Sequence, residues 1–158
     1  MSKIDIRWMI RGDMPAVLEI ERECFEFNWD HDDFMRALSQ RNCIGMVAEI
    51  EDQVVGFMIY CLHKTRLEII NFAVDPVFRN QGVGSTMLHK LTSKLNEDRR
   101  HKLVLAIRDS NLPAHLFFSR HGLICTRIIP EFYPDCDDAA YWFEMDCRKQ
   151  HGAAVVGV

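Results

Sequence analysis

The sequence predicts a single α+β domain, in which strands and helices are mixed along the chain. Apolar, β-branched runs of strand length alternate with amphipathic helical stretches in the order β-α-α-β-β-β-α-β-α-β-β, over about residues 4–147. The chain has 158 residues and an apolar content of 48%, which suits one hydrophobic core and leaves no room for a second domain. We therefore expect one domain over residues 1–158, with an ordered core over about 4–147 and a loose tail at 148–158.

The N-terminal part of the chain predicts an edge strand followed by two helices. Ile4–Met9 alternates weakly, and Gly12-Asp13 with Pro15 behind it marks a helix start. Asp30 is positioned to cap the second, shorter helix. In the first helix, four polar residues are expected to face water, namely Glu19, Glu21, Arg22 and Glu23.

The remaining elements follow from β-branched runs and from turn and cap residues. Glu51-Asp52-Gln53 is a polar connection of hairpin type, and Asn111-Leu112-Pro113 begins a helix that Gly122 ends. Another helix runs from Gly82 to about Asn96. The expected strands are Cys43–Ile50, Val54–Leu62, Arg66–Val74, Lys102–Arg108, Leu123–Ile129 and Ala139–Asp146.

Net charge and the lack of long apolar runs limit the classes of partner. The formal charge is −4 and both signs are mixed along the chain, so neither nucleic acid nor an anionic membrane is an obvious partner. No apolar run approaches the length that spans a bilayer, and the first residues carry charges at Lys3, Asp5 and Arg7. We therefore expect a cytoplasmic protein.

The cysteines and histidines follow no metal-binding or disulfide pattern. The seven histidines contain no His-x-x-x-His pair, so we expect no metal site. The six cysteines lie far apart without a C-x-x-C pair. We expect six free thiols, mostly packed in the core, at Cys24, Cys43, Cys61, Cys125, Cys136 and Cys147.

A phosphate-binding turn is predicted where the strand Ile69–Val74 runs into the helix that begins at Gly82. Asp75-Pro76 ends the strand, and Gly82 and Gly84 let the backbone come close to a ligand. The first N–H groups of a helix lack intrahelical partners, and together with the helix dipole and the Arg79 side chain they suit a diphosphate. The alternative is a glycine turn that only begins a helix.

The pattern Arg79-x-x-Gly82-x-Gly84, after a strand that ends Ala-Val-Asp-Pro, resembles the acetyl-CoA pyrophosphate loop of the GCN5-related N-acetyltransferase (GNAT) superfamily. It is not a Walker loop, because no Gly-Lys-Ser/Thr follows, and its glycine spacing differs from the Rossmann fingerprint. The resemblance covers about residues 4–147 and implies the GNAT fold, a mostly antiparallel mixed sheet of about seven strands with about four helices on both faces. It also implies acetyl-CoA as the cofactor, with CoA as a product.

The same resemblance implies cofactor contacts on this strand and loop and on the later helix. In the family, the strand before the loop offers backbone groups to pantetheine and to the reacting carbonyl. The implied cofactor-binding residues are Phe72, Ala73, Val74, Arg79, Asn80, Gln81, Gly82, Val83, Gly84, Ser85, Asn111 and Phe118. Asn111 also has a purely structural explanation as a helix cap.

Three short segments resemble the bacterial ribosomal-protein alanine N-acetyltransferases, a branch that modifies protein α-amino groups. Phe27-Asn28-Trp29 is similar to that branch's Phe-Pro-Trp, Ile107-Arg108-Asp109-Ser110-Asn111 to its Val-Arg-x-Ser-Asn, and Phe132-Tyr133-Pro134 to its Tyr-Tyr-Pro. The branch implies acetyl transfer to a protein or peptide amine, an N-terminal α-amine, by direct attack in a ternary complex.

Aromatic residues of these segments are implied to bind the acceptor, as walls of a groove in which a peptide lies. The groove would run between the Phe27–Trp29 segment and the Tyr133 loop. Ordinary packing is the alternative for Phe27 and Trp29, whereas an irregular loop favours a functional Tyr133. The implied acceptor-binding residues are Phe27, Trp29, Asn71 and Tyr133.

The side chains that this branch uses for acid–base catalysis are missing from the sequence. Its glutamate base falls on Ala106, and its tyrosine acid falls on Phe118. Neither side chain can exchange a proton. Another residue must therefore act as the base, or the protein does something other than that branch.

Glu68 is the replacement that the sequence offers for the missing base. Period-2 alternation puts it on the same face of its strand as Phe72 and Val74. The histone-acetylating members of the superfamily keep their catalytic glutamate in Glu-Ile-Val-Phe-Cys-Ala-Ile, which resembles residues 68–74 without a gap. We therefore expect Glu68 to be catalytic, with Tyr133 as the second catalytic candidate. The alternative is a structural Glu68, exposed to water or paired with Arg66 or Arg108.

Two further functions stay open beside transfer to a protein or peptide amine. The first is acetylation of a small amine such as a polyamine or amino sugar. The acidic residues of the late loop would suit such a cation, namely Glu131, Asp135, Asp137 and Asp138. The second is a non-catalytic acyl-CoA-binding sensor, for which the absence of the usual base and acid is the argument.

Overall fold

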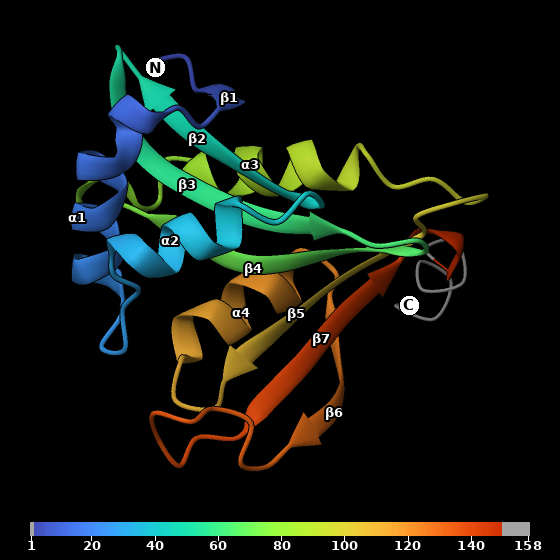
Figure 1. Ribbon diagram of the computed structural model, residues 1–158. Helices are drawn as coiled ribbons and strands as arrows, with labels where there is room; N and C mark the ends of the chain where they lie inside the picture. The colour runs from blue at the N-terminus through green and yellow to red at the C-terminus, as the bar shows by residue number, and fades with distance from the viewer. Residues whose placement is uncertain (1, 150–158) are drawn as a thin grey trace. The chain divides into compact units, whose positions relative to one another are not determined.

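The computed structural model describes residues 2–149 and has the element order that the sequence predicts (Figure 1). Its seven strands belong to one mixed sheet, which confirms the expected fold class. The strands are β1 Asp5–Trp8, β2 Cys43–Ile50, β3 Gln53–Leu62, β4 Arg66–Val74, β5 Lys102–Arg108, β6 Ile124–Ile129 and β7 Ala140–Asp146. The helices are α1 Met14–Cys24, α2 His31–Leu38, α3 Val83–Thr92 and α4 Leu112–Arg120, with short 3₁₀ turns η1 Arg11–Asp13, η2 Pro76–Phe78 and η3 Cys147–Lys149.

The chain divides into two compact units. Among residues 2–149, the first comprises 2–62 together with 69–93, and the second comprises 63–68 together with 94–149. The first unit contains β1, β2 and β3, most of β4, and the helices α1, α2 and α3. The second contains the start of β4 and the strands β5, β7 and β6 with α4.

In the first unit, helices cover both faces of β2 and β3. One face packs against α1 and α2, and its core consists of Met14, Val17, Ile20, Phe34, Val47, Phe57, Ile59 and Ala73. The opposite face carries Gly56, where a Cβ atom would lie 3.0 Å from Met87 and 3.3 Å from Val83 of α3. Successive strand residues point to opposite faces, so Val47, Phe57 and Ile59 lie in the core with α1 and α2, whereas Gly56 lies against α3.

The local signals that predicted the helix and turn positions are present in the structure. Asp30 caps α2 through a bond from the Asp33 N–H to its Oδ1 at 2.8 Å, and Asp33 accepts in return from the Asp30 N–H. Glu51 and Asp52 form the β2–β3 turn with φ values of 50° and 65°. This left-handed pair is the conformation of a two-residue hairpin turn.

A β-bulge changes the register between β2 and β3. Next to the turn, Glu49 pairs with Val54, whereas Ala48 pairs with Gly56. Val55 is therefore one additional residue in β3 at this point. Every pair farther from the turn is shifted by one position as a result.

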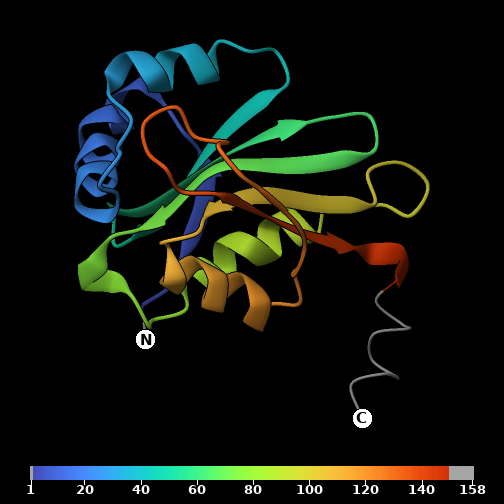
Figure 2. The same cartoon turned by 90° about the horizontal axis from the view of Figure 1, so that it is seen from below.

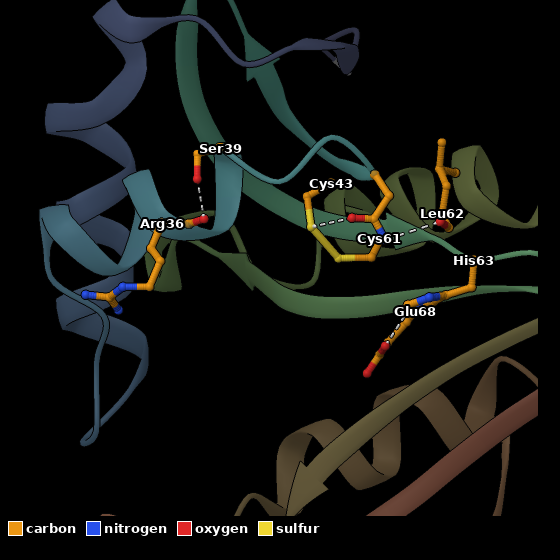
Figure 3. The surroundings of a disulfide bond; sticks show 8 residues. Arg36, Ser39, Cys43, Cys61, Leu62, His63 and Glu68 are labelled. Carbon is orange, nitrogen blue, oxygen red and sulfur yellow. Dashed lines mark hydrogen bonds and ion pairs between the residues drawn. A yellow bond between two sulfur atoms is a disulfide. The ribbon is translucent and has the colours of Figure 1, made fainter.

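The shifted register overturns the expectation of six free thiols. Cys43 lies directly opposite Cys61, with 4.2 Å between the Cα atoms, and the two form a disulfide (Figure 3). Without the bulge, Cys43 would face Tyr60 instead. The other four cysteines, Cys24, Cys125, Cys136 and Cys147, are free.

An ion-pair network fastens β1 to its neighbours in the first unit. Arg7 donates two hydrogen bonds of 2.8 Å to the Asp13 carboxylate and a third, also 2.8 Å, from Nε to Glu49. The hydrogen bonds from Arg7 hold the pKa of the buried Asp13 carboxyl below its ordinary value. The network thereby connects β1, η1 and β2 through one guanidinium group.

The second unit is an antiparallel arrangement of β5, β7 and β6 with α4 packed on it (Figure 2). The His115 ring of α4 lies 4.9 Å from the Tyr141 ring and 5.3 Å from the Phe143 ring of β7. Arg148 and Lys149, which we expected in the loose tail, form η3, and the Arg148 N–H donates to Asp146 at 3.0 Å. The rest of that expected tail lies outside the described residues.

Candidate functional site

The turn after β4 is shaped by backbone conformations and by one capping side chain. Asp75 Oδ1 accepts a hydrogen bond of 3.0 Å from the Val77 N–H, which starts η2. Asn80 and Gly82 then adopt left-handed φ values of 63° and 85°. Glycine adopts such a value without steric cost, and the second of these residues is the N-cap of α3.

The N-terminus of α3 has the geometry of an anion site. The Thr86 N–H donates to the Gly82 carbonyl at 3.0 Å, so the Val83 and Gly84 N–H groups precede this intrahelical bond. Val83 is buried and anchors the first turn, whereas Gly82 is exposed and no atom lies within 4 Å of where its Cβ would be. Open space over this glycine leaves room for a ligand to approach the backbone, where the helix dipole favours a negative charge.

Arg79 follows η2 in the predicted phosphate-binding loop, and its side chain reaches back to the end of β4. Its Nε donates to the Val74 carbonyl at 3.3 Å, and its Nη2 lies 3.2 Å from Cys24 Sγ. The side chain is exposed. The residues from Arg79 to Ser85 that the resemblance implied to bind the cofactor are therefore contiguous within the first unit, next to Phe72, Ala73 and Val74 of β4.

The alternation predicted for β4 is present in the structure. Leu67, Ile69, Asn71 and Ala73 are buried, whereas Glu68, Ile70, Phe72 and Val74 are only partly buried. Glu68 therefore shares the face of Phe72 and Val74, as the period-2 alternation predicts.

Glu68 is paired with a residue that the sequence analysis did not consider. His63 Nε2 lies 2.9 Å from Glu68 Oε1 (Figure 3). The side chains are 35% and 26% exposed, so the pair is partly shielded but reachable by solvent. The two arginines proposed as alternative partners are otherwise engaged, since Arg108 binds Asp135 and Arg66 lies over the Trp142 ring.

The segment between α1 and α2 contains the first of the predicted acceptor-binding aromatics. The Trp29 ring meets the Phe34 ring edge to face with 5.1 Å between centroids, and Phe34 meets Phe57 in the core at 5.6 Å. Packing therefore accounts for the position of the Trp29 ring. Phe27 is partly buried in the same segment.

Glu21 is buried, and the expectation that it faces water was wrong. Its exposed fraction is 2%, because it follows Val17 by four positions and precedes Cys24 by three and so lies on the apolar stripe of α1. That spacing was available in the sequence. Glu21 Oε2 accepts from the Trp29 N–H at 2.8 Å, and Oε1 accepts from Asn71 Nδ2 at 2.8 Å. Burial raises the pKa of this carboxyl above its ordinary value, against the effect of the two hydrogen bonds.

Tyr133 and Arg108 form a stacked pair in the second unit. The Arg108 guanidinium lies 3.9 Å from the centre of the Tyr133 ring and donates two hydrogen bonds of 2.8 Å to Asp135. Burial raises the pKa of Tyr133 to about 12, although the charge of Arg108 opposes this shift. Tyr133 therefore keeps its proton at neutral pH.

The remaining predicted site residues also belong to the second unit. Asn111 caps α4 by accepting from the Ala114 N–H at 3.3 Å, as its structural explanation requires. Phe118 is buried in α4, and Ala106 pairs with Trp142 of β7. Among residues 2–149, no group of three or more histidine, cysteine, aspartate or glutamate residues could hold a metal ion. No helix in this range has the length and apolar character to cross a membrane.

Each unit thus holds its own part of the predicted site. The first holds the α3 N-terminus, Phe27, Trp29 and Asn71, and the second holds Glu68, Asn111, Phe118 and Tyr133. Sequence reasoning missed Glu21, which its helical spacing could have indicated, and His63, for which the sequence offered no signal. Both are hydrogen-bonded to residues that had been predicted.

Known proteins resemble the chain along most of its length. The family model described as "Acetyltransferase (GNAT) family" matches residues 14–123. The uncharacterized N-acetyltransferase MJ1530 of Methanocaldococcus jannaschii is 33% identical over 136 residues, which cover 85% of this chain and 86% of that protein. The ribosomal protein bS18-alanine N-acetyltransferase of Salmonella typhimurium is 27% identical over 122 residues, covering 77% of this chain and 82% of that enzyme.

Solved structures have the same fold. A GNAT family acetyltransferase from Elizabethkingia anophelis with acetyl-CoA bound superposes with a TM-score of 0.73 at 20% identity, covering 90% of this chain and 97% of that one. At this identity the likeness shows the fold alone. The family model and the relatives confirm the resemblance that the loop after β4 had indicated, including its bacterial ribosomal-protein alanine branch. The chain belongs to the acetyltransferase (GNAT) family of enzymes.

Proposed function

We propose that this enzyme transfers an acetyl group from acetyl-CoA to a protein or peptide amine, an N-terminal α-amine. The single observation that carries the proposal is the open N-terminus of α3 after β4, with its left-handed Gly82 and the amide groups of the first turn. Such a helix end suits the diphosphate of CoA. The acetyl-CoA in the Elizabethkingia structure supports the same donor for this chain.

Different residues of the loop and of β4 would bind different parts of the donor. The Val83 and Gly84 amides would bind the diphosphate, with Arg79 adding a positive charge at the edge of the loop. Backbone groups of Phe72 and Val74, on the exposed side of β4, would hold the pantetheine arm. Acetyl-CoA supplies the acetyl thioester, and every other part of the reaction depends on groups of the protein.

Acid–base chemistry falls to Glu68 and Tyr133. The Glu68 carboxylate, held by His63 at 2.9 Å, would take a proton from the acceptor ammonium directly or through a water, so that the free amine attacks in a ternary complex. The thiolate that leaves needs a proton. Tyr133, with a pKa of about 12, keeps its hydroxyl proton and can donate it or share it in a hydrogen bond.

An α-amine is the acceptor that the chain's relatives support. The Salmonella relative is named for acetylating an alanine of ribosomal protein bS18. The Phe27–Trp29 segment and the Tyr133 loop offer aromatic surface of the kind that binds an extended peptide. We also propose that the reaction takes place in the cytoplasm.

The acidic late loop gives less support to a small cationic acceptor than the sequence suggested. Asp135 is bound by Arg108, and Asp138 accepts a 2.8 Å hydrogen bond from Ser110 Oγ. Two of the four acidic groups therefore stabilise the loop itself, while Glu131 and Asp137 are exposed. The Glu68–His63 pair likewise favours an enzyme over a non-catalytic sensor, because it would supply a base in place of the missing one.

Mass spectrometry with three sets of acceptors tests the proposal. The first set contains peptides with a free α-amine and no lysine, the second contains the same peptides N-terminally blocked with one internal lysine, and the third contains polyamines and amino sugars. We expect acetylation of the first set. Acetylation of the third set alone would establish the small-amine function, and binding of CoA without transfer to any acceptor would establish the sensor.

A further inference from the structure

Glu21 is a buried acid that the proposed reaction does not use. Of the residues that the structure describes, the buried polar or charged ones are Asp13, Glu21 and Asn71. Asp13 has the Arg7 guanidinium as its partner, whereas both hydrogen bonds to Glu21 come from neutral groups. Burying a carboxylate against neutral donors costs free energy. An apolar side chain would fill the same space in the core without that cost, so packing alone does not account for a glutamate at this position.

The hydrogen bonds of Glu21 continue into the strand predicted to bind the cofactor. Asn71 donates to Glu21 Oε1 through Nδ2, and Asn71 Oδ1 accepts from the Phe72 N–H at 2.9 Å. A carboxylate accepts only, and a backbone N–H donates only, so the two contacts together require this orientation of the Asn71 amide. The second oxygen of Glu21 holds the Trp29 N–H. One carboxylate therefore connects the backbone at Trp29 with the backbone at Phe72.

We propose that Glu21 is a positioning residue that sets the acceptor-binding segment at Trp29 and the cofactor strand at Phe72 relative to each other. The proposal rests on the proposed function, because it assigns Trp29 to the acceptor and Phe72 to the donor. Glu21 itself is buried, with an exposed fraction of 2%. Its carboxylate holds two backbone N–H groups on segments that are 43 residues apart in the chain, Trp29 directly and Phe72 through the Asn71 amide (72 − 29 = 43).

Exchanging the two polar side chains provides a sharp test. In Glu21→Gln, one oxygen can still accept from Trp29, but the new NH₂ group meets the Asn71 NH₂ group, donor against donor. In Asn71→Asp, two carboxylates face each other. In the double variant Glu21→Gln/Asn71→Asp, the introduced glutamine amide donates to the introduced aspartate, whose other oxygen still accepts from Phe72. All three hydrogen bonds are therefore restored, while the negative charge moves from position 21 to position 71.

We expect each single variant to lower kcat/KM for the acceptor peptide roughly tenfold, and the double variant to return to within about threefold of the wild type. The affinity for CoA measured by calorimetry should change less than the acceptor parameters, because the α3 amides are untouched. Glu23→Gln, an exposed glutamate on the same helix, is the matched control and should leave both quantities unchanged. A role in folding alone would lower the melting temperature and leave kcat and KM of the folded protein as they are, which would overturn the proposal.

Amide NMR makes the outcome independent of activity. The Phe72 amide proton should shift in Glu21→Gln, although Phe72 does not contact Glu21, and it should return in the double variant. An unshifted Phe72 amide, or a double variant that recovers neither the shift nor the activity, would reject the positioning role. Failure of the wild type to acetylate any peptide would reject the proposed function instead, and the amide shifts would still decide whether Glu21 connects the two segments.

Discussion

His63 and Glu68 face each other at the start of β4, with 2.9 Å between Nε2 and Oε1. The His63 N–H also donates to the Arg66 carbonyl at 2.9 Å, which closes the turn before β4. Backbone and side chain together therefore fix the imidazole against the carboxylate. This arrangement fits the general base that we propose, and the partly exposed histidine would offer the proton a route to solvent.

Replacing Glu68 with glutamine should lower turnover about 10²-fold or more, the usual scale for loss of a general base. The side chain keeps its shape and one hydrogen-bond acceptor, so binding of CoA should hardly change. The loss should shrink as the pH rises, because more of the acceptor amine is then neutral without help from the enzyme. Glu144→Gln, which removes the partner of Lys102 in the same unit, is the control. If the Glu68→Gln variant turned over as fast as the wild type at neutral pH, Glu68 would have a structural role and would not be the base.

A carboxylate introduced at Gly84 should weaken binding of the donor. Gly84→Asp places a negative charge in the first turn of α3, where it repels a diphosphate, and we expect the Kd for CoA to rise about tenfold or more. Arg79→Ala should raise the Kd less, because most of the donors are backbone groups. Calorimetry with CoA measures both, and Gly12→Asp adds the same charge in η1 as a control. Equal affinity in Gly84→Asp and the wild type would show that the loop is not the phosphate site.

Removing the hydroxyl group of Tyr133 should lower turnover without moving the pH profile. Burial raises the pKa of Tyr133 to about 12, so the group stays protonated throughout the range in which the enzyme can be assayed. Tyr133→Phe keeps the ring under Arg108 at 3.9 Å and removes only the proton donor. We expect kcat to fall while both limbs of the pH–rate curve stay in place. A limb that disappears in Tyr133→Phe would mean that this hydroxyl titrates during turnover.

Reduction should destabilise the protein through Cys43 and Cys61. Their disulfide closes a loop with a sequence separation of 18, for which chain entropy predicts a stabilisation of about 3 kcal/mol. Thiol titration in denaturant should detect four thiols before reduction and six after it. The melting temperature of the Cys43→Ser/Cys61→Ser variant should not respond to reductant, whereas Cys125→Ser should respond like the wild type. Six thiols before reduction would contradict the disulfide.

Asp13→Asn should destabilise the first unit at neutral pH by roughly 2 kcal/mol, because Arg7 loses its charged partner. Hydrogen bonds from Arg7 hold the pKa of Asp13 below the ordinary 3.8. The contribution of Asp13 is therefore complete above pH 3.8 and is lost as the pH falls through the lower folded-state value. Urea unfolding at pH 7 and at about pH 2 measures the difference, with the exposed Asp5→Asn as the control. A difference that stays constant with pH would show that the charge of Asp13 does not contribute.

The sequence alone determined the order of the elements and the location of the loop that we propose to bind the donor. Alternation in β4 and the capping residues Asp30 and Asn111 act within a few residues of themselves, so they could be predicted without knowledge of distant contacts. The conformation of the loop from Asp75 to Gly82 also depends on residues within the loop itself. Its proline, its glycine and its position between a strand and a helix shape it whatever the rest of the chain does.

Only the tertiary structure decided which distant residues meet. The partner of Cys43 depends on a single additional residue, Val55, because a bulge shifts every pair beyond it by one position. The position of Glu21 on the apolar stripe of its helix follows from local spacing. Its hydrogen bond to Asn71 does not, because Asn71 lies in β4, 50 residues away in the chain. Such contacts depend on the free energy of packing the whole core, to which many residues contribute at once. A local pattern in the sequence does not report that total free energy, so it cannot predict these contacts.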